Sequence, residues 1–151
     1  MGDGAATVDV VRQGAARRVP VRGFKAKARR ILHLLNLEDC ELSVALVGDE
    51  EIRRLNGRYR SLDEPTDVLS FPVEEPLPSG RRIIGDVVIS VEKATRQARQ
   101  RRRSLDDELE VLLIHGILHN LGYDHERSAK DEREMRAMER RLRGQLKAAQ
   151  T

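Results

Sequence analysis

Hydrophobic and polar positions follow two different periods along this chain of 151 residues. Residues 7–13 alternate weakly between apolar and polar side chains, and residues 42–47 and 68–71 are compact apolar runs. Pro72 directly follows the third run, which is typical of a strand that stops at a sheet edge. Residues 85–91 form a nearly continuous apolar run that we expect to be buried on both faces. The pattern therefore predicts four strands, with residues 74–82, rich in Pro and Gly, as an exposed loop.

Five other segments carry apolar residues at helical spacing: 21–35, 49–58, 92–100, 104–121 and 128–146. Asp49, Ser104 and Ser128 stand where helix N-caps are expected, and Asp107 completes a capping box in outline with Ser104. Residues 111–121 are apolar on most sides, so this helix should be buried, with any site on it at the floor of a pocket. The fold class is α+β, with a small mixed sheet of about four strands and about five helices in one domain, residues 1–151.

The composition of the chain says more about its core and its surface charge than about its function. Aromatic residues make up 3%, so the core must be aliphatic. The net charge of +3 is weak support for a polyanion partner, although 23 of the 28 basic residues are Arg. This bias fits phosphate contact and a GC-rich genome equally well. The basic stretches 17–30 and 96–103 are either nucleic-acid contacts or solvated helix faces.

The cysteine and hydropathy patterns favour a cytoplasmic location. Cys40 is the one cysteine, which excludes an internal disulfide, and beside a strand it is expected to be a packing residue rather than a nucleophile. No apolar run approaches the ~20 residues that cross a bilayer, so we expect no membrane association. The N-terminal residues show no apolar stretch typical of a signal peptide.

Three of the four histidines lie within eleven residues, as His115, His119 and His125. A spacing of four places His115 and His119 on one helix face, where both imidazoles can reach one metal ion. Gly122 permits the left-handed turn that ends a helix and can return His125 to the same ion. Three nitrogen ligands with one open position describe a catalytic Zn²⁺ site, one ion per chain. His33, isolated on an apolar helix face, is not expected to be a ligand.

The cluster lacks the glutamate of the zinc-peptidase motif H-E-x-x-H, because Gly116 occupies that position. This argues against a working metalloprotease. Gly116 serves either close packing of the helix against the sheet or space for substrate. Asp124 is either a partner of the site, as a hydrogen-bonding group or a proton acceptor, or a turn residue after Gly122.

Three sequence blocks resemble a known family. The cluster reads His115-Gly-x-Leu-His119-x-x-Gly-Tyr-Asp-His125, and it is similar to the signature of the YbeY family of ribosomal-RNA maturation endoribonucleases. Two further blocks agree in order and spacing: Asn56-Gly-Arg-Tyr59-Arg60 followed by Pro65-Thr-Asp67-Val-Leu-Ser70-Phe71-Pro72, and Gly85-Asp86-Val-Val-Ile-Ser90. Asn120 departs from the family's usual Leu but is not a ligand position.

The resemblance implies a zinc-dependent, single-strand-specific endoribonuclease with a zincin-like metal-hydrolase arrangement. It further implies a role in late-stage 70S ribosome quality control and in maturation of the 16S rRNA 3′ end. The implied partners are ribosomal RNA and the small ribosomal subunit, with ribosomal proteins or an assembly GTPase as further candidates. His115, His119 and His125 carry over as metal ligands, His115 also as a catalytic residue, and Arg60 as the catalytic, substrate-binding arginine. A guanidinium beside a metal can grip a phosphate, which agrees with that role.

Weaker candidates and alternatives remain at this point. Asp67 or Ser70 is expected to form hydrogen bonds near the site, and Asp86 either orients a ligand histidine or holds a turn. The first alternative function is a zinc hydrolase of a peptide or another non-RNA substrate. The second is a ribosome-assembly binding factor with incidental nuclease activity.

Overall fold

The computed structural model describes residues 6–60, 66–73, 81–124 and 127–148, with the side chain of Arg60 excepted. Its four strands form one sheet in the order β1-β2-β4-β3. The strands β1 (Thr7–Arg12), β2 (Cys40–Val47) and β4 (Arg82–Ser90) are mutually parallel where they pair. The edge strand β3 (Val68–Phe71) runs antiparallel to β4, so the sheet is mixed as predicted.

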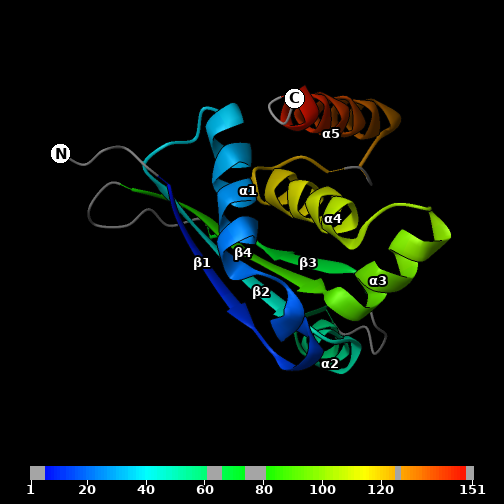
Figure 1. Cartoon of the computed structure of the whole chain (residues 1–151). Coiled ribbons are helices and arrows are strands. Elements are labelled where there is room, and N and C mark those ends of the chain that lie inside the picture. The colour runs from blue at the N-terminus through cyan, green and yellow to red at the C-terminus, as the bar shows by residue number, and fades with distance from the viewer. Residues whose placement is uncertain (1–5, 61–65, 74–80, 125–126, 149–151) are drawn as a thin grey trace.

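The five predicted helices are all present: α1 (Val21–Leu34), α2 (Asp49–Arg60), α3 (Val91–Gln100), α4 (Leu105–Asn120) and α5 (Ala129–Ala148). A short 3-10 turn, Gly14–Arg18, precedes α1. Figure 1 shows α1 and α4 over one face of the sheet, α5 outside them, and α2 at the far end of the sheet. The α+β prediction is therefore confirmed. None of the helices in the described ranges has the length and apolar character needed to cross a bilayer.

Strand β4 starts earlier than its hydrophobic pattern predicts, at Arg82 instead of Gly85. Gly85 reads as a strand start because glycine usually interrupts regular structure. In the structure it has a φ of +114°, and the pairing with β2 shifts register between Glu41 and Leu42, which marks a β-bulge. A Cβ at Gly85 would collide with the backbone oxygen of Phe71 on the neighbouring strand. The glycine thus allows β4 to continue through the bulge.

The main core lies between the sheet and the helices α1, α3 and α4, with α5 packed on its outer side, and it is largely aliphatic, with Phe24 as its buried aromatic residue. Six of the nine buried residues of α4 lie between positions 112 and 118, which confirms the predicted burial of its apolar half. A smaller cluster lies on the other face of the sheet, where α2 packs. The largest fully buried side chains are Ile31, Leu32, Leu42, Leu46, Ile52, Ile84, Ile89, Leu113, Ile114, Ile117, Leu118 and Met135.

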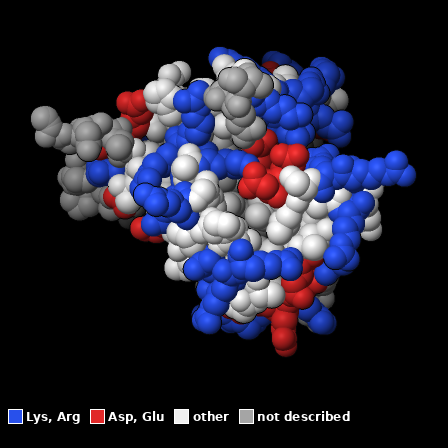
Figure 2. All heavy atoms as spheres, in the orientation of Figure 1, with Lys and Arg blue, Asp and Glu red and all other residues white. Residues whose placement is uncertain are grey.

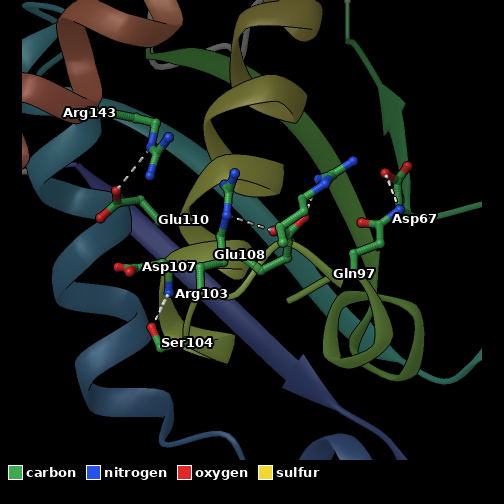
Figure 3. Close-up of polar contacts among 9 residues, drawn as sticks. Asp67, Gln97, Arg103, Ser104, Asp107, Glu108, Glu110 and Arg143 are labelled. Atoms are coloured by element: carbon green, nitrogen blue, oxygen red, sulfur yellow. Dashed lines mark hydrogen bonds and ion pairs between the residues drawn. The ribbon is translucent and has the colours of Figure 1, made fainter. Parts of the chain in front are cut away.

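Two buried glutamates fix α4 among its neighbours, and Figure 3 shows them on the same helix. The Glu108 side chain is 0% exposed and pairs with Arg101 at 2.8 Å and Arg103 at 3.5 Å. The Glu110 side chain is 4% exposed and lies 3.3 Å from Lys27 of α1 and 3.8 Å from Arg143 of α5. Buried carboxylates need such partners, because an unpaired buried charge is strongly destabilising. The Glu110 pairs therefore join α4 to α1 and α5, whereas the Glu108 pairs join it to the segment between α3 and α4.

Intramolecular ion pairs account for part of the basic stretch 96–103. Arg96 lies 2.7 Å from Asp49, and Arg101 and Arg103 both pair with Glu108. Three arginines of this stretch thus have intramolecular carboxylate partners, which reduces their capacity to bind phosphates. Asp49 itself is the first residue of α2, and its carboxylate also accepts a hydrogen bond from Ser90 Oγ at 2.7 Å.

Candidate metal centre

Helix α4 carries two of the three clustered histidines, and its ends are defined by local sequence. Ser104 is the N-cap, and its hydroxyl accepts a hydrogen bond from the Asp107 backbone N–H at 3.0 Å (Figure 3). At the other end, Gly122 has a φ of +104°. Its N–H donates to the His119 carbonyl at 3.1 Å, and the Tyr123 N–H donates to the Leu118 carbonyl at 3.1 Å. This is a Schellman motif, so the predicted left-handed turn after the helix is confirmed.

His115 and His119 lie on the same face of α4, as their spacing predicts. Their ring centroids are 6.3 Å apart with an interplanar angle of 50°. Both residues are half-buried on a helix whose other faces are largely buried. His125, the third expected ligand, lies outside the described residues, and within the described ranges no three metal-binding side chains are grouped. Imidazole nitrogens are donors that zinc accepts, at about 2.0–2.1 Å, so the chemistry of this pair fits zinc.

Glu139 of α5 contacts His115, and the sequence patterns did not single it out. Its Oε2 lies 3.0 Å from His115 Nδ1. The two side chains are 28% and 24% exposed for His115 and Glu139, so the contact is partly shielded from water. Glu139 is 24 residues from His115 in sequence. In sequence it is one of many charged residues of the last helix, so no local pattern distinguishes it from the others.

Gly116 faces the sheet. A Cβ on this residue would lie 2.6 Å and 3.1 Å from the two γ-methyl groups of Val87 and 3.3 Å from Ser70 Oγ. Of the two roles that the sequence left open for Gly116, the structure supports close packing of the histidine-bearing helix against the sheet. The same geometry leaves no room for the glutamate of a zinc-peptidase motif without displacement of β4.

Ser70 of β3 and Asp67, which precedes this strand, form hydrogen bonds with different helices. Ser70 Oγ donates a hydrogen bond to the Gly116 carbonyl at 3.1 Å, between the two histidines in sequence. The Asp67 carboxylate instead accepts a hydrogen bond from Gln97 Nε2 of α3 at 3.3 Å (Figure 3). Ser70 therefore supports the helix that carries the histidines, whereas Asp67 joins β3 to α3.

Asp86 lies inside β4 and not at a turn, and its side chain is on the strand face opposite α4, so it orients neither of the two described histidines of the cluster. Val87, the next residue along β4, faces Gly116 of α4, and side chains alternate between the two faces of a strand. Asp86 lines a cavity of about 470 Å³ on the opposite face, together with its cross-strand neighbours Ser43 and Phe71. Partial desolvation beside this cavity raises the pKa of its carboxyl group. Its backbone, by contrast, contacts α4, since its carbonyl accepts a hydrogen bond from Asn120 Nδ2 at 3.1 Å.

Asp124 and Arg60 lie at the margins of the described structure. The Asp124 carboxylate lies 3.7 Å from Arg127 Nε, three residues further along the chain. Arg60 is the last residue of α2, and the preceding Tyr59 packs edge-on against Phe71 at a centroid distance of 5.4 Å. The end of α2 is thereby held at β3, the edge strand whose Ser70 contacts α4.

Basic side chains gather on the surface near the helices that flank this region. Figure 2 shows them over α1 and α5, with a group of acidic side chains between. Exposed members on α5 include Arg133, Arg140 and Arg141. Positive charge is thus concentrated on these helices, although the net charge of the chain is only +3.

Comparison with known proteins identifies the family. The model of the family described as Endoribonuclease YbeY matches residues 11–147. The chain belongs to the YbeY family of endoribonucleases. The Aquifex aeolicus protein named Endoribonuclease YbeY is 48% identical over 122 residues, which are 81% of each chain. An Anaeromyxobacter protein of the same name is 50% identical over 83% of this chain and 64% of its own length.

A solved structure agrees with this membership. The solution structure of a Thermotoga maritima protein matches 95% of this chain and 93% of its own, with a TM-score of 0.65 and 28% sequence identity. The resemblance carried by the three sequence blocks is thus confirmed, and the chain is a member of an enzyme family of metal-dependent hydrolases.

Proposed function

We propose that this protein is a zinc-dependent endoribonuclease that cuts single-stranded RNA. Its proposed role is late-stage 70S ribosome quality control and maturation of the 16S rRNA 3′ end in the cytoplasm. The observation that carries the zinc dependence is the pair of imidazoles on one face of α4, 6.3 Å apart, with a carboxylate on one of them. Relatives that are 48% and 50% identical are named endoribonucleases, which supports RNA as the substrate.

The residues of the chain have distinct parts in this proposal. His115, His119 and His125 would hold the ion, one per chain. Bound zinc supplies a Lewis acid and a water whose pKa is lowered toward neutrality. Arg60 holds the scissile phosphate and offsets the charge that builds on it during cleavage. Ser70 keeps α4 against the sheet through the Gly116 carbonyl, so the imidazoles keep their direction.

The partners follow from the same proposal. Ribosomal RNA and the small ribosomal subunit are the proposed binding partners, with ribosomal proteins or an assembly GTPase as further ones. Exposed arginines on α1 and α5 would contact RNA phosphates (Figure 2). Peptide hydrolysis is disfavoured, because Gly116 stands where zinc peptidases carry the glutamate that acts as general base. A side chain at this position would collide with Val87.

A cleavage assay tests the proposal. Wild-type protein with one equivalent of Zn²⁺ is mixed with a precursor of 16S rRNA, and the products are separated by gel electrophoresis. His115→Ala and Arg60→Ala should both abolish cleavage while their circular dichroism spectra remain unchanged. The controls are His33→Ala, an exposed histidine paired with Glu38, and Arg58→Ala, whose guanidinium lies over Tyr59.

Full activity in both site variants would refute the proposal. Ribosome binding by an inactive His119→Ala variant that retains its cellular role would favour the assembly-factor alternative.

A further inference from the structure

The contact between Glu139 and His115 has a defined chemical consequence. Imidazole carries two ring nitrogens, and in the neutral form one of them is a donor and the other an acceptor. A carboxylate only accepts hydrogen bonds, so the 3.0 Å contact with Glu139 Oε2 requires the proton on His115 Nδ1. The lone pair is then on Nε2, the nitrogen directed away from Glu139.

This arrangement is the one that a metal-binding histidine needs. Ligand histidines commonly donate their second N–H to a carboxylate, which fixes the tautomer and the ring orientation and strengthens the ligand nitrogen. We propose that Glu139 is the positioning residue of the metal centre, acting through His115 and not by binding the ion. The inference rests on the zinc site of the proposed function.

The packing of α5 holds Glu139 in place. Met135 and Leu142 are buried one turn before and about one turn after it, so this face of α5 is directed toward the core. Arg143, four residues after Glu139, reaches Glu110 of α4 at 3.8 Å. Two helix contacts to α4, at Glu139 and at Arg143, thus lie along one face of α5.

Other acidic residues of α5 behave differently. Glu132 lies 2.7 Å from Arg136 and Glu134 lies 3.9 Å from Lys130, both on the same helix. These are exposed pairs four residues apart, which stabilise a helix only weakly. Glu139 instead spans two helices and ends on a histidine of the proposed zinc site. The C-terminal helix therefore contributes to that site without supplying a ligand.

Zinc affinity tests the inference directly. The wild type, Glu139→Ala and Glu139→Gln are titrated against a chromophoric zinc chelator, and the absorption spectrum of each Co²⁺-loaded protein is recorded. Loss of the carboxylate should weaken zinc binding about 10- to 100-fold. Glu139→Gln keeps an acceptor oxygen without the charge, so the decrease in zinc affinity should be smaller in this variant. Glu38→Ala is the matched control, because Glu38 also accepts from a histidine, His33 at 2.8 Å, but at an exposed pair away from α4.

Each outcome is decisive. The positioning role would be overturned if the wild type binds zinc tightly and the zinc affinity of Glu139→Ala is within twofold of that of Glu38→Ala. The proposed function would still stand in that case. A wild type that binds no zinc would overturn both. A purely structural role would lower the melting temperature of the metal-free protein and leave the affinity and the Co²⁺ spectrum unchanged, which also overturns the proposal. If Glu139→Ala does not fold, Glu139→Leu, which keeps side-chain volume and helix propensity, carries the same expectation.

Discussion

Gly116 provides the sharpest test of how the histidine-bearing helix is fixed against the sheet. The perturbation is Gly116→Ala, a single methyl group added between the two histidines. The new Cβ would lie 2.6 Å and 3.1 Å from the γ-methyl groups of Val87, a residue with 0% exposure. Carbon atoms prefer separations of about 3.5–4.0 Å, so the Val87 side chain, β4 or α4 must give way by about 0.9 Å at the shorter contact.

Two opposing terms set the magnitude. Alanine is favoured over glycine within a helix by about 0.8–1.0 kcal/mol. An extra methyl group in a well-packed core costs typically about 1–3 kcal/mol. Because the contact is to a side chain on a central strand with little freedom to shift, we expect the packing cost to exceed the helix gain. The net loss in the free energy of unfolding should be about 1–2 kcal/mol.

The assay is a double-mutant cycle in urea with a chelator present, so that zinc binding does not contribute. Val87→Ala removes the two methyl groups that the new Cβ at position 116 would meet. The pair should therefore be coupled, with the double variant more stable than the sum of the single losses by about 1 kcal/mol. Gly144→Ala on α5 is the control, since no atom lies within 4 Å of its added Cβ. It should stabilise the protein by roughly 0.5–1 kcal/mol.

Additive effects in the cycle would contradict the reasoning, because they would show that the methyl group of residue 116 does not meet Val87. The reasoning would also be contradicted if Gly116→Ala raised the free energy of unfolding by as much as Gly144→Ala does. Either result would return Gly116 to the second role considered from the sequence, space for substrate, and a cleavage assay on the variant would then be the next measurement.

Three further predictions concern the pH dependence, the thiol and the helix cap. Partial desolvation beside the cavity raises the pKa of Asp86, so its ionised form opposes folding, and stability falls as the pH rises through the folded-state pKa. Asp86→Asn should therefore stabilise the protein at pH 7 in urea titrations, and the gain should vanish at a pH below the carboxyl's ordinary value. Cys40 is 1% exposed with a pKa raised mainly by burial, so native protein at pH 8 should react with a thiol reagent far more slowly than urea-unfolded protein. Ser104→Ala removes the acceptor for the Asp107 N–H and should cost about 1 kcal/mol in thermal unfolding, while zinc affinity is unchanged.

The local elements of this fold were predictable because their signals are local. Helix α4 has a serine cap at one end and a glycine in the left-handed conformation at the other, and both were predicted at their observed positions. The histidine pair followed from helical spacing alone. The early start of β4 was missed, because a glycine that permits a bulge has the same sequence signal as a glycine that ends a strand.

The sequence by itself determined the elements, the family and the pairing of His115 with His119 on one helix face, since each depends on the spacing of neighbouring residues. Only the tertiary structure decided which distant residues meet them. It directed Asp86 to the face away from α4, because side chains alternate along a strand and Val87 occupies the position against Gly116. It brought Glu139 to His115, because burial of one face of α5 directs this carboxylate toward α4. Such contacts depend on the packing of elements far apart in the chain, which no local spacing encodes.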